Sequence, residues 1–115
     1  MLVRQADLAP IDFDGLKIFD YTANSKLRSS LAIIEIPSGS KHAEAWSKRS
    51  DKYYLVIEGQ IQFTLDDKEF TLAEGDFCYV EQGNHFSYRN DKAEPAALVL
   101  VHTLGFDPDA EIFAE

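Results

Sequence analysis

Cysteine is almost absent from this chain of 115 residues, and the single thiol, Cys78, cannot form an internal disulfide. Disulfides are typical of oxidising compartments, so their absence fits a reducing one. Cys78 lies in the apolar run FCYV, which predicts a small buried core residue rather than a nucleophile. The N-terminal residues show no signal-peptide pattern, and together these features predict a cytoplasmic protein.

Basic residues and long apolar runs are also scarce. The chain has 11 Lys and Arg against 20 Asp and Glu, which gives a formal net charge of −9. An acidic surface repels phosphate backbones and anionic lipids, so nucleic acid and membranes are poor partners. No apolar run approaches the roughly 20 residues that a membrane-spanning helix needs. No phosphate loop, zinc finger or Ser-His-Asp order is found either.

Apolar residues at helical spacing are missing as well. The alternation of polar and apolar residues that is typical of β-strands, by contrast, recurs along the chain. Residues 60–65 alternate polar and apolar side chains, a tight turn follows, and residues 69–72 alternate again, which predicts a hairpin. Further strands are expected at 15–21, after a turn at Asp14 and Gly15, and at 27–37, 51–59 and 96–106, the last buried on both faces. Short strands separated by regular turn signals predict an all-β sandwich or barrel.

The length of the chain suits one domain, residues 1–115. Its core is expected over residues 27–106, preceded by one or more N-terminal strands within 1–26. A short tail, 107–115, follows the core. The segment DPDAEIF in this tail is the best candidate for a helix.

Two stretches of the sequence resemble the motifs of the cupin superfamily. PSGSKHAEAWSKRSDKYYLVIEGQIQFTL is similar to the first motif and AEGDFCYVEQGNHFSYRN to the second. The resemblance covers roughly residues 31–110 and is to small single-domain cupins. It implies a jelly-roll barrel built from two sheets. In metal-binding cupins the first motif supplies two His and one Glu and the second supplies a third His, all directed into the barrel.

The four metal-ligand positions implied by the resemblance hold other residues. Lys52 falls at the Glu position, Lys48 and Trp46 at the first two His positions, and Phe86 at the third His position. A protonated lysine has no lone pair, and indole and phenyl rings are not ligands. The resemblance therefore implies a cupin with degenerate ligand positions and no metal cofactor. Two inward ammonium groups would favour an anion.

Two alternatives concern the lysines. Lys48 and Lys52 belong to the polar run SKRSDK, and polar runs are usually exposed to solvent. A shift of the alignment by one residue exchanges the two faces of a strand. In that case Ser47 or Asp51 would point inward instead.

The resemblance implies a pocket lined by aromatic side chains together with the two lysines. Such a pocket suits a small anionic or aromatic molecule. The opposite face of the strand after Lys52 is too apolar to face water and predicts a homodimer. The predicted pocket residues are Trp46, Lys48, Lys52, Tyr54, Phe86 and Tyr88, and the predicted dimer face contains Tyr53, Leu55 and Ile57.

A displaced metal site is the main alternative. His42 and Glu44 have the spacing to share a strand face, and His85 and His102 lie on later strands. Two or three His with a carboxylate are typical ligands of Fe, Mn, Ni or Zn. Such a site would make the protein a metal-dependent dioxygenase or isomerase.

Three further hypotheses about function stay open at this point. A metal-free barrel would bind a small molecule as a sensor or carrier. A metal-independent sugar epimerase or isomerase would need a general base, His85 or His102, and a proton donor, Tyr54 or Tyr88. A buried lysine of lowered pKa would instead suit Schiff-base chemistry. A closed barrel without a cavity would indicate an interaction domain.

Overall fold

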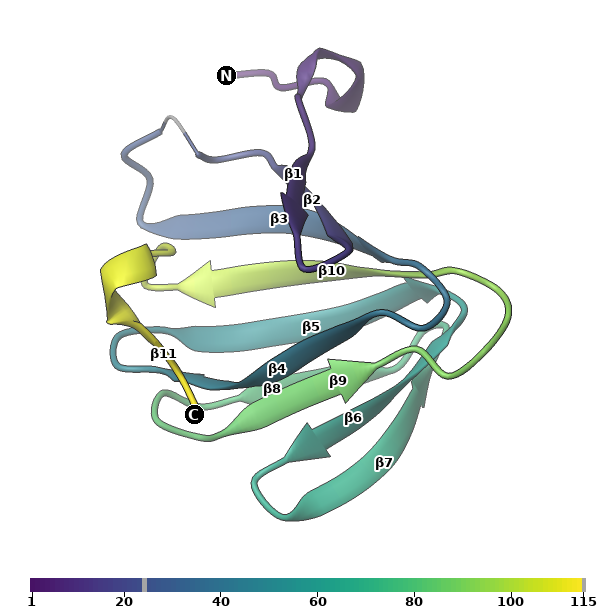
Figure 1. Ribbon diagram of the computed structural model, residues 1–115. Helices are drawn as coiled ribbons and strands as arrows, with labels where there is room; N and C mark the ends of the chain where they lie inside the picture. The colour runs from purple at the N-terminus through teal and green to yellow at the C-terminus, as the bar shows by residue number, and fades with distance from the viewer. Residues whose placement is uncertain (24, 115) are drawn as a thin grey trace.

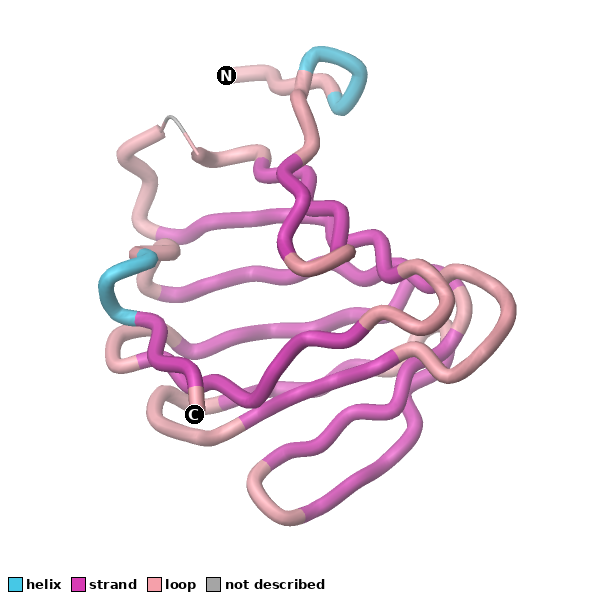
Figure 2. Tube along the Cα trace, in the orientation of Figure 1, coloured by secondary structure: helices cyan, strands magenta, loops and turns pink. Residues whose placement is uncertain are grey.

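The computed structural model describes residues 1–23 and 25–114, and in it two antiparallel sheets face each other (Figures 1 and 2). The first sheet has the strand order β1-β2-β3-β10-β5-β8 and the second the order β11-β4-β9-β6-β7. This architecture confirms the prediction of an all-β jelly-roll barrel. The strands are β1 (Ile11–Phe13), β2 (Leu16–Asp20), β3 (Ser29–Ile36), β4 (Lys41–Ser47), β5 (Asp51–Glu58), β6 (Gln60–Leu65), β7 (Lys68–Ala73), β8 (Phe77–Val80), β9 (Phe86–Arg89), β10 (Ala96–Thr103) and β11 (Glu111–Phe113).

The core lies between the sheets and follows the period-two pattern of the sequence. Ile61 and Phe63 of β6 are fully buried, and the predicted hairpin pairs β6 with β7. On β5, Lys52, Tyr54 and Val56 alternate inward, as the spacing predicts. The buried aromatic rings of Tyr54 and Phe63 meet edge to face at 5.2 Å between centroids. Strand alternation therefore sets which side chains of β5 and β6 face the barrel interior.

The outer face of the first sheet is apolar and exposed around β5 and β8. Tyr53 lies opposite Tyr79 and Leu55 opposite Phe77 in the register of these strands, and all four side chains are 37–55% exposed. The homodimer expected through this face stays a prediction. Cys78, on the inward side of β8, is buried, and burial raises the pKa of its thiol to about 11.

The N-terminal segment is a hairpin that extends the first sheet. Asp14 and Gly15 both have positive φ, 50° and 89°, which is the geometry of a two-residue hairpin turn. The turn predicted at this pair joins β1 to β2, with Ile11 opposite Ile18, and β2 in turn pairs with β3, with Ile18 opposite Ile34. Leu16 is fully buried as a result. Figure 1 shows this hairpin crossing one end of the barrel.

The C-terminal segment differs from the helix considered for it. A single 3₁₀ turn, η2 (Pro108–Ala110), is capped by the Asp107 side chain, which accepts a hydrogen bond from the Asp109 amide. The chain then extends as β11 and pairs with β4, with Ile112 opposite Trp46. A segment as short as DPDAEIF does not form a stable isolated α-helix. Pairing with the edge of a sheet provides partners for its backbone N–H and C=O groups instead.

Strand β10 lies at the centre of the first sheet, between β3 and β5. Its inward residues Leu98 and Leu100 are buried, whereas the outward Val99 and Val101 are half-buried rather than covered. The expectation of burial on both faces is therefore wrong, because nothing in the described chain packs over the outer face. In the described residues no helix is long and apolar enough to cross a membrane.

Candidate functional site

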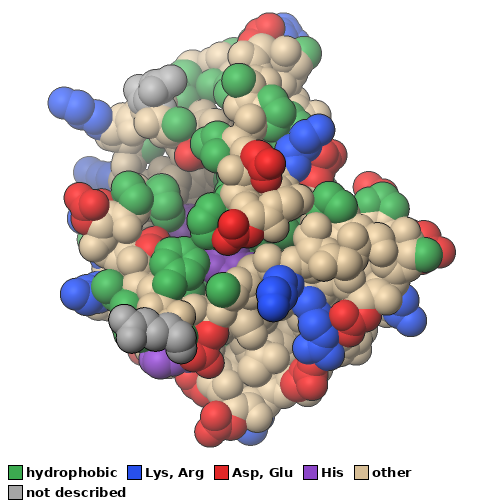
Figure 3. Space-filling view, in the orientation of Figure 1, with side chains coloured by type: hydrophobic (Ala, Val, Ile, Leu, Met, Phe, Trp, Pro, Cys, Tyr) green, Lys and Arg blue, Asp and Glu red, His purple; other side chains and the backbone are tan. Residues whose placement is uncertain are grey.

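A cavity of about 340 Å³ opens between the two sheets. Figure 3 shows it as a hollow with histidine at its base and hydrophobic side chains around it. Its walls come from both sheets, and its rim comes from the N-terminal hairpin and the C-terminal segment. The lining residues are Ile11, Phe13, Leu16, Ile18, Asp20, Ser30, Leu31, Ala32, Ile34, His42, Lys52, Tyr54, Tyr88, Leu100, His102, Phe106, Pro108, Glu111 and Phe113.

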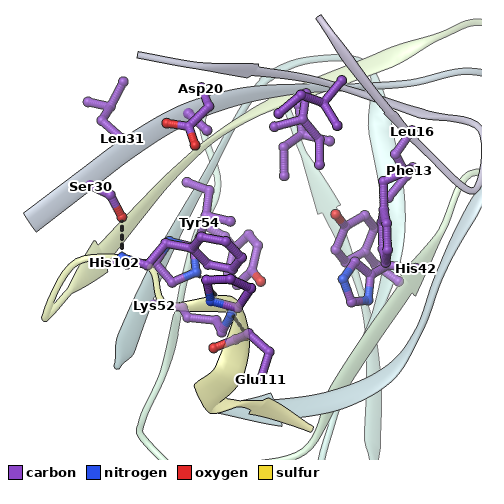
Figure 4. A pocket seen from close by; sticks show the side chains of 18 of the residues that line it. Phe13, Leu16, Asp20, Ser30, Leu31, His42, Lys52, Tyr54, His102 and Glu111 are labelled. Carbon is purple, nitrogen blue, oxygen red and sulfur yellow. Dashed lines mark hydrogen bonds and ion pairs between the residues drawn. The ribbon is translucent and has the colours of Figure 1, made fainter. Parts of the chain in front are cut away.

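A buried ion pair forms one wall of this cavity (Figure 4). Lys52 of β5 is 3% exposed, and its Nζ donates to Glu111 Oε1 at 2.5 Å. The same ammonium group donates to His102 Nε2 at 3.0 Å and lies 5.0 Å from the centroid of the Phe86 ring. Burial lowers the pKa of Lys52, and the carboxylate of Glu111 opposes that shift. A buried ion pair needs close contact and additional hydrogen bonds to offset the loss of hydration. Here the ammonium group of Lys52 has both, the carboxylate of Glu111 and the imidazole of His102.

His102 is a neutral acceptor in this cluster. Burial, followed by the positive charge of Lys52, lowers the pKa of His102 to about 3. Because its Nε2 accepts from the lysine, its remaining proton is on Nδ1. The Phe106 ring packs edge-on against the imidazole at 5.2 Å. His102 therefore positions Lys52 and has no free lone pair for a ligand.

Two buried polar atoms of the cavity have no partner within the described chain, the Tyr88 hydroxyl and Glu111 Oε2. Tyr88 is 3% exposed and the Glu111 side chain 8%. Burial raises the pKa of Tyr88, so its hydroxyl stays protonated and can both donate and accept. Buried polar groups in folded proteins almost always have a partner, and an unmet one costs about 1–3 kcal/mol. Both atoms are therefore candidate contacts for a bound molecule.

His42 lies on the opposite wall, beside Phe13 (Figure 4). Its Nδ1 donates to the carbonyl of Ala43 at 2.7 Å, which leaves the lone pair on Nε2. Burial, the largest cause, lowers the pKa of His42, and the positive charge of Lys52 acts in the same direction. The ring also stacks on Phe113 of β11 at 5.8 Å. His42 is thus a fixed, neutral imidazole whose Nε2 is a potential base.

The structure brings together some of the predicted pocket residues. Lys52, Tyr54 and Tyr88 all line the cavity. Phe86 is buried directly behind the Lys52 ammonium group rather than at the cavity surface. Within the first cupin motif, Lys52 is therefore the ligand-position residue that points into the barrel.

Trp46 and Lys48 lie elsewhere. Trp46 stacks on His85 outside the barrel, with 4.1 Å between ring centroids and 4° between planes. Lys48 is exposed in the turn after β4. The cause is the register of β4, in which Ala45 and Ser47 are buried and face inward, so that Trp46 between them faces outward. The alternative alignment, shifted by one residue so that Ser47 points inward, therefore describes β4 correctly.

The residues of the alternative metal site are divided between the cavity and the outer face of the second sheet. His42 and His102 line the cavity, whereas His85 and Glu44 form an exposed pair at 3.7 Å beside Trp46. In residues 1–23 and 25–114 no group of three His, Cys, Asp or Glu is arranged to hold a metal ion. At the cupin ligand positions an ammonium group and a phenyl ring do not fit a divalent cation. The residues at these positions therefore do not fit a resident metal ion.

Glu111 and Asp20 are cavity residues that the sequence did not reveal. Glu111 lies in the tail, outside both motifs, and its only signal is the alternation of Glu-Ile-Phe after a turn. Asp20 ends β2, where its Oδ1 accepts from the Thr22 amide at 3.0 Å. Glu111 is brought to the cavity by β11, which pairs with β4 far away in sequence, and Asp20 by β2, which pairs with the next strand, β3.

The family follows from a comparison with family models. Residues 32–102 match the model described as Cupin domain. The chain belongs to the cupin family. Among curated proteins, this cupin is 24% identical over 70 residues to the inner kinetochore subunit cnp3 of Schizosaccharomyces pombe. That match covers 61% of the chain but only 11% of the kinetochore protein.

Solved structures show the same fold at low identity. A nucleoside dehydratase of Streptomyces superposes with a TM-score of 0.87 at 16% identity, covering 100% of this cupin and 91% of that chain. A Thermotoga maritima protein described as a predicted oxalate decarboxylase gives 0.82 at 18% identity, covering 90% and 99%. The cupin domain of cnp3 gives 0.75 at 19% identity, covering 86% and 70%. At such identities the likeness extends to the fold alone.

Proposed function

We propose that this cupin binds a small organic molecule inside its barrel without a metal ion. The observation that carries the proposal is the pair of unpartnered buried atoms, Tyr88 Oη and Glu111 Oε2, in one open cavity. A ligand that meets both removes two unmet polar groups at once. The cavity volume of about 340 Å³ lies within the range of small-molecule sites.

The shape of the cavity favours a ligand with an apolar or planar part and a polar part. The rim consists mainly of exposed apolar side chains, among them Phe106 and Phe113 at 47% and 44%. The polar part would reach the buried cluster of Lys52 and Glu111. A nucleoside has this division, and the Streptomyces dehydratase has been solved with uridine. Uridine is therefore the first probe.

Replacing Tyr88 by phenylalanine tests the proposal through two opposite effects. The hydroxyl has no partner in the free protein, so its removal is expected to leave stability unchanged or raise it by about 1 kcal/mol. Binding of uridine, or of the best neutral ligand from a panel of nucleosides and sugars, is expected to weaken roughly tenfold. Calorimetry in EDTA measures the affinity, and urea unfolding measures the stability.

Tyr53→Phe is the matched control, because Tyr53 adjoins Tyr54 on the same strand but faces the outside. It should change neither property. Equal affinities of the Tyr88→Phe variant and the wild type would contradict the proposed contact. Binding that disappears in EDTA would contradict the metal-free site.

A second function, acid–base catalysis on the bound molecule, is supported by His42. Its tautomer is fixed by Ala43, and its lowered pKa keeps Nε2 unprotonated at neutral pH. A neutral imidazole is a suitable general base. Of the bases expected from the sequence, His85 lies outside the barrel and His102 is committed to Lys52. The base of a metal-independent reaction would therefore be His42.

His42→Gln separates binding from catalysis. The amide retains a polar group of similar reach but cannot take up a proton, so we expect uridine affinity to change less than about threefold while turnover is lost. Mass spectrometry detects loss of water from panel ligands that carry a carbonyl beside the C–H, where His42 would take the C–H proton and the neighbouring hydroxyl would leave as water. His85→Gln, on the outer face, is the control and should retain turnover. Turnover that survives His42→Gln would rule out this base.

A further inference from the structure

We infer that Glu111 sets the charge class of the ligand, so that the cavity selects neutral molecules bearing a hydroxyl or N–H donor and rejects anionic ones. This inference rests on the proposed binding function and specifies its ligand. It reverses the preference for an anion that two inward lysines would have implied. Lys48 is exposed, and the charge of Lys52 is already compensated.

The titratable groups that line the cavity give it no excess positive charge. Lys52 and Glu111 pair at 2.5 Å, and His42 and His102 have lowered pKa values and are neutral. Asp20 adds a carboxylate on the wall formed by β2. The remaining titratable groups are the hydroxyls of Tyr54 and Tyr88, whose pKa values are raised by burial. The sum is one negative charge in a region of low dielectric, where a ligand anion is repelled.

The free oxygen of Glu111 makes the selection more specific. Oε1 accepts from Lys52, whereas Oε2 is buried without a partner in the described chain. A carboxylate can only accept hydrogen bonds. The ligand group beside Oε2 must therefore donate, as a hydroxyl or amide does. A ligand carboxylate in the same place would set two anions against each other and leave both desolvated.

Glu111→Gln is expected to reverse the selection. The amide has the same shape, but Lys52 loses its counter-charge and is left with His102 as a neutral acceptor. Burial already lowers the pKa of Lys52, and removing the carboxylate that opposes this shift lowers it further. An anionic ligand would restore the missing charge. Its binding to the variant should therefore take up a proton and strengthen as pH falls.

Calorimetry with three probes tests this selection: uridine, its 5′-carboxylate, and orotidine, which carries a carboxylate on the base. The wild type is expected to bind uridine at least about tenfold more tightly than either anion. In the Glu111→Gln variant at least one anion should bind more tightly than uridine, with proton uptake seen in buffers of different ionisation enthalpy. Asp109→Asn removes an exposed carboxylate from the same terminal segment and should keep the wild-type order.

The outcomes separate the inference from the function on which it rests. A wild type that binds an anion as tightly as uridine overturns the inference and leaves small-molecule binding intact. The same holds for a folded Glu111→Gln variant that keeps the wild-type order. A wild type that binds none of the three probes overturns the nucleoside-like ligand and the inference together. The relative affinities of the wild type for uridine and the two anions are measured without any variant. The inference can therefore be contradicted even if the Glu111→Gln variant does not fold.

Discussion

Replacing Lys52 by methionine is expected to lower the free energy of unfolding by about 3–5 kcal/mol, the largest effect of any single change at the cavity. The substitution leaves the Glu111 carboxylate buried without its cation and deprives His102 Nε2 of its donor. The apolar side chain fits the space beside Phe86, so lost packing contributes little. The cost comes from a buried charge without a partner, which is far larger than that of a broken surface pair.

Urea unfolding of two further variants shows whether the cause is electrostatic. Lys48→Met removes a neighbouring lysine that is exposed, and should change stability by less than about 0.5 kcal/mol. The double variant Lys52→Met/Glu111→Leu removes both charges and should recover most of the loss. A Lys52→Met variant as stable as Lys48→Met would show that the ion pair is not formed in solution.

Acidification is expected to destabilise the protein below about pH 6.5, mainly through His102. Its pKa is about 3 in the folded protein and 6.5 in the unfolded chain. Between these values the unfolded chain binds a proton that the folded chain does not, so stability falls as pH falls. Integrated over this window, the loss is on the order of 4 kcal/mol. His42, whose pKa is also lowered, acts in the same direction.

The variant His102→Gln tests the origin of this pH dependence. Its side-chain oxygen can still accept from Lys52, but it does not titrate. Urea midpoints measured from pH 7 to pH 4 should decline much less steeply in this variant than in the wild type. His85→Gln removes an exposed histidine and should decline as the wild type does. An equally steep decline in His102→Gln and wild type would exclude His102 as the source.

Much of the fold was predictable because strand alternation is local. The Asp14–Gly15 turn, the β6–β7 hairpin and the inward row of Lys52, Tyr54 and Val56 all follow from neighbouring residues. Strand alternation also correctly predicted three of the cavity residues, Lys52, Tyr54 and Tyr88. A residue within a regular strand has only two possible faces, and the buried one is recognisable from its apolar neighbours.

The rest of the site depends on register and on long-range pairing, which no local pattern contains. Trp46 and Lys48 were misplaced because β4 has an irregular register between His42 and Ala45. Glu111 was missed because it reaches Lys52 only after β11 pairs with β4. That pairing also changes the chemistry of the site, because the carboxylate of Glu111 neutralises the positive charge of Lys52 in the cavity.

The most direct test of the proposed function is a crystal structure of the protein grown with uridine or the best neutral ligand, in EDTA. We expect ligand density inside the barrel, with polar atoms within hydrogen-bond distance of Tyr88 Oη and Glu111 Oε2, the two atoms that the described chain leaves unpartnered. A ligand bound outside the barrel, a metal ion coordinated by His42 and His102, or a Lys52 that points to solvent would contradict the proposal.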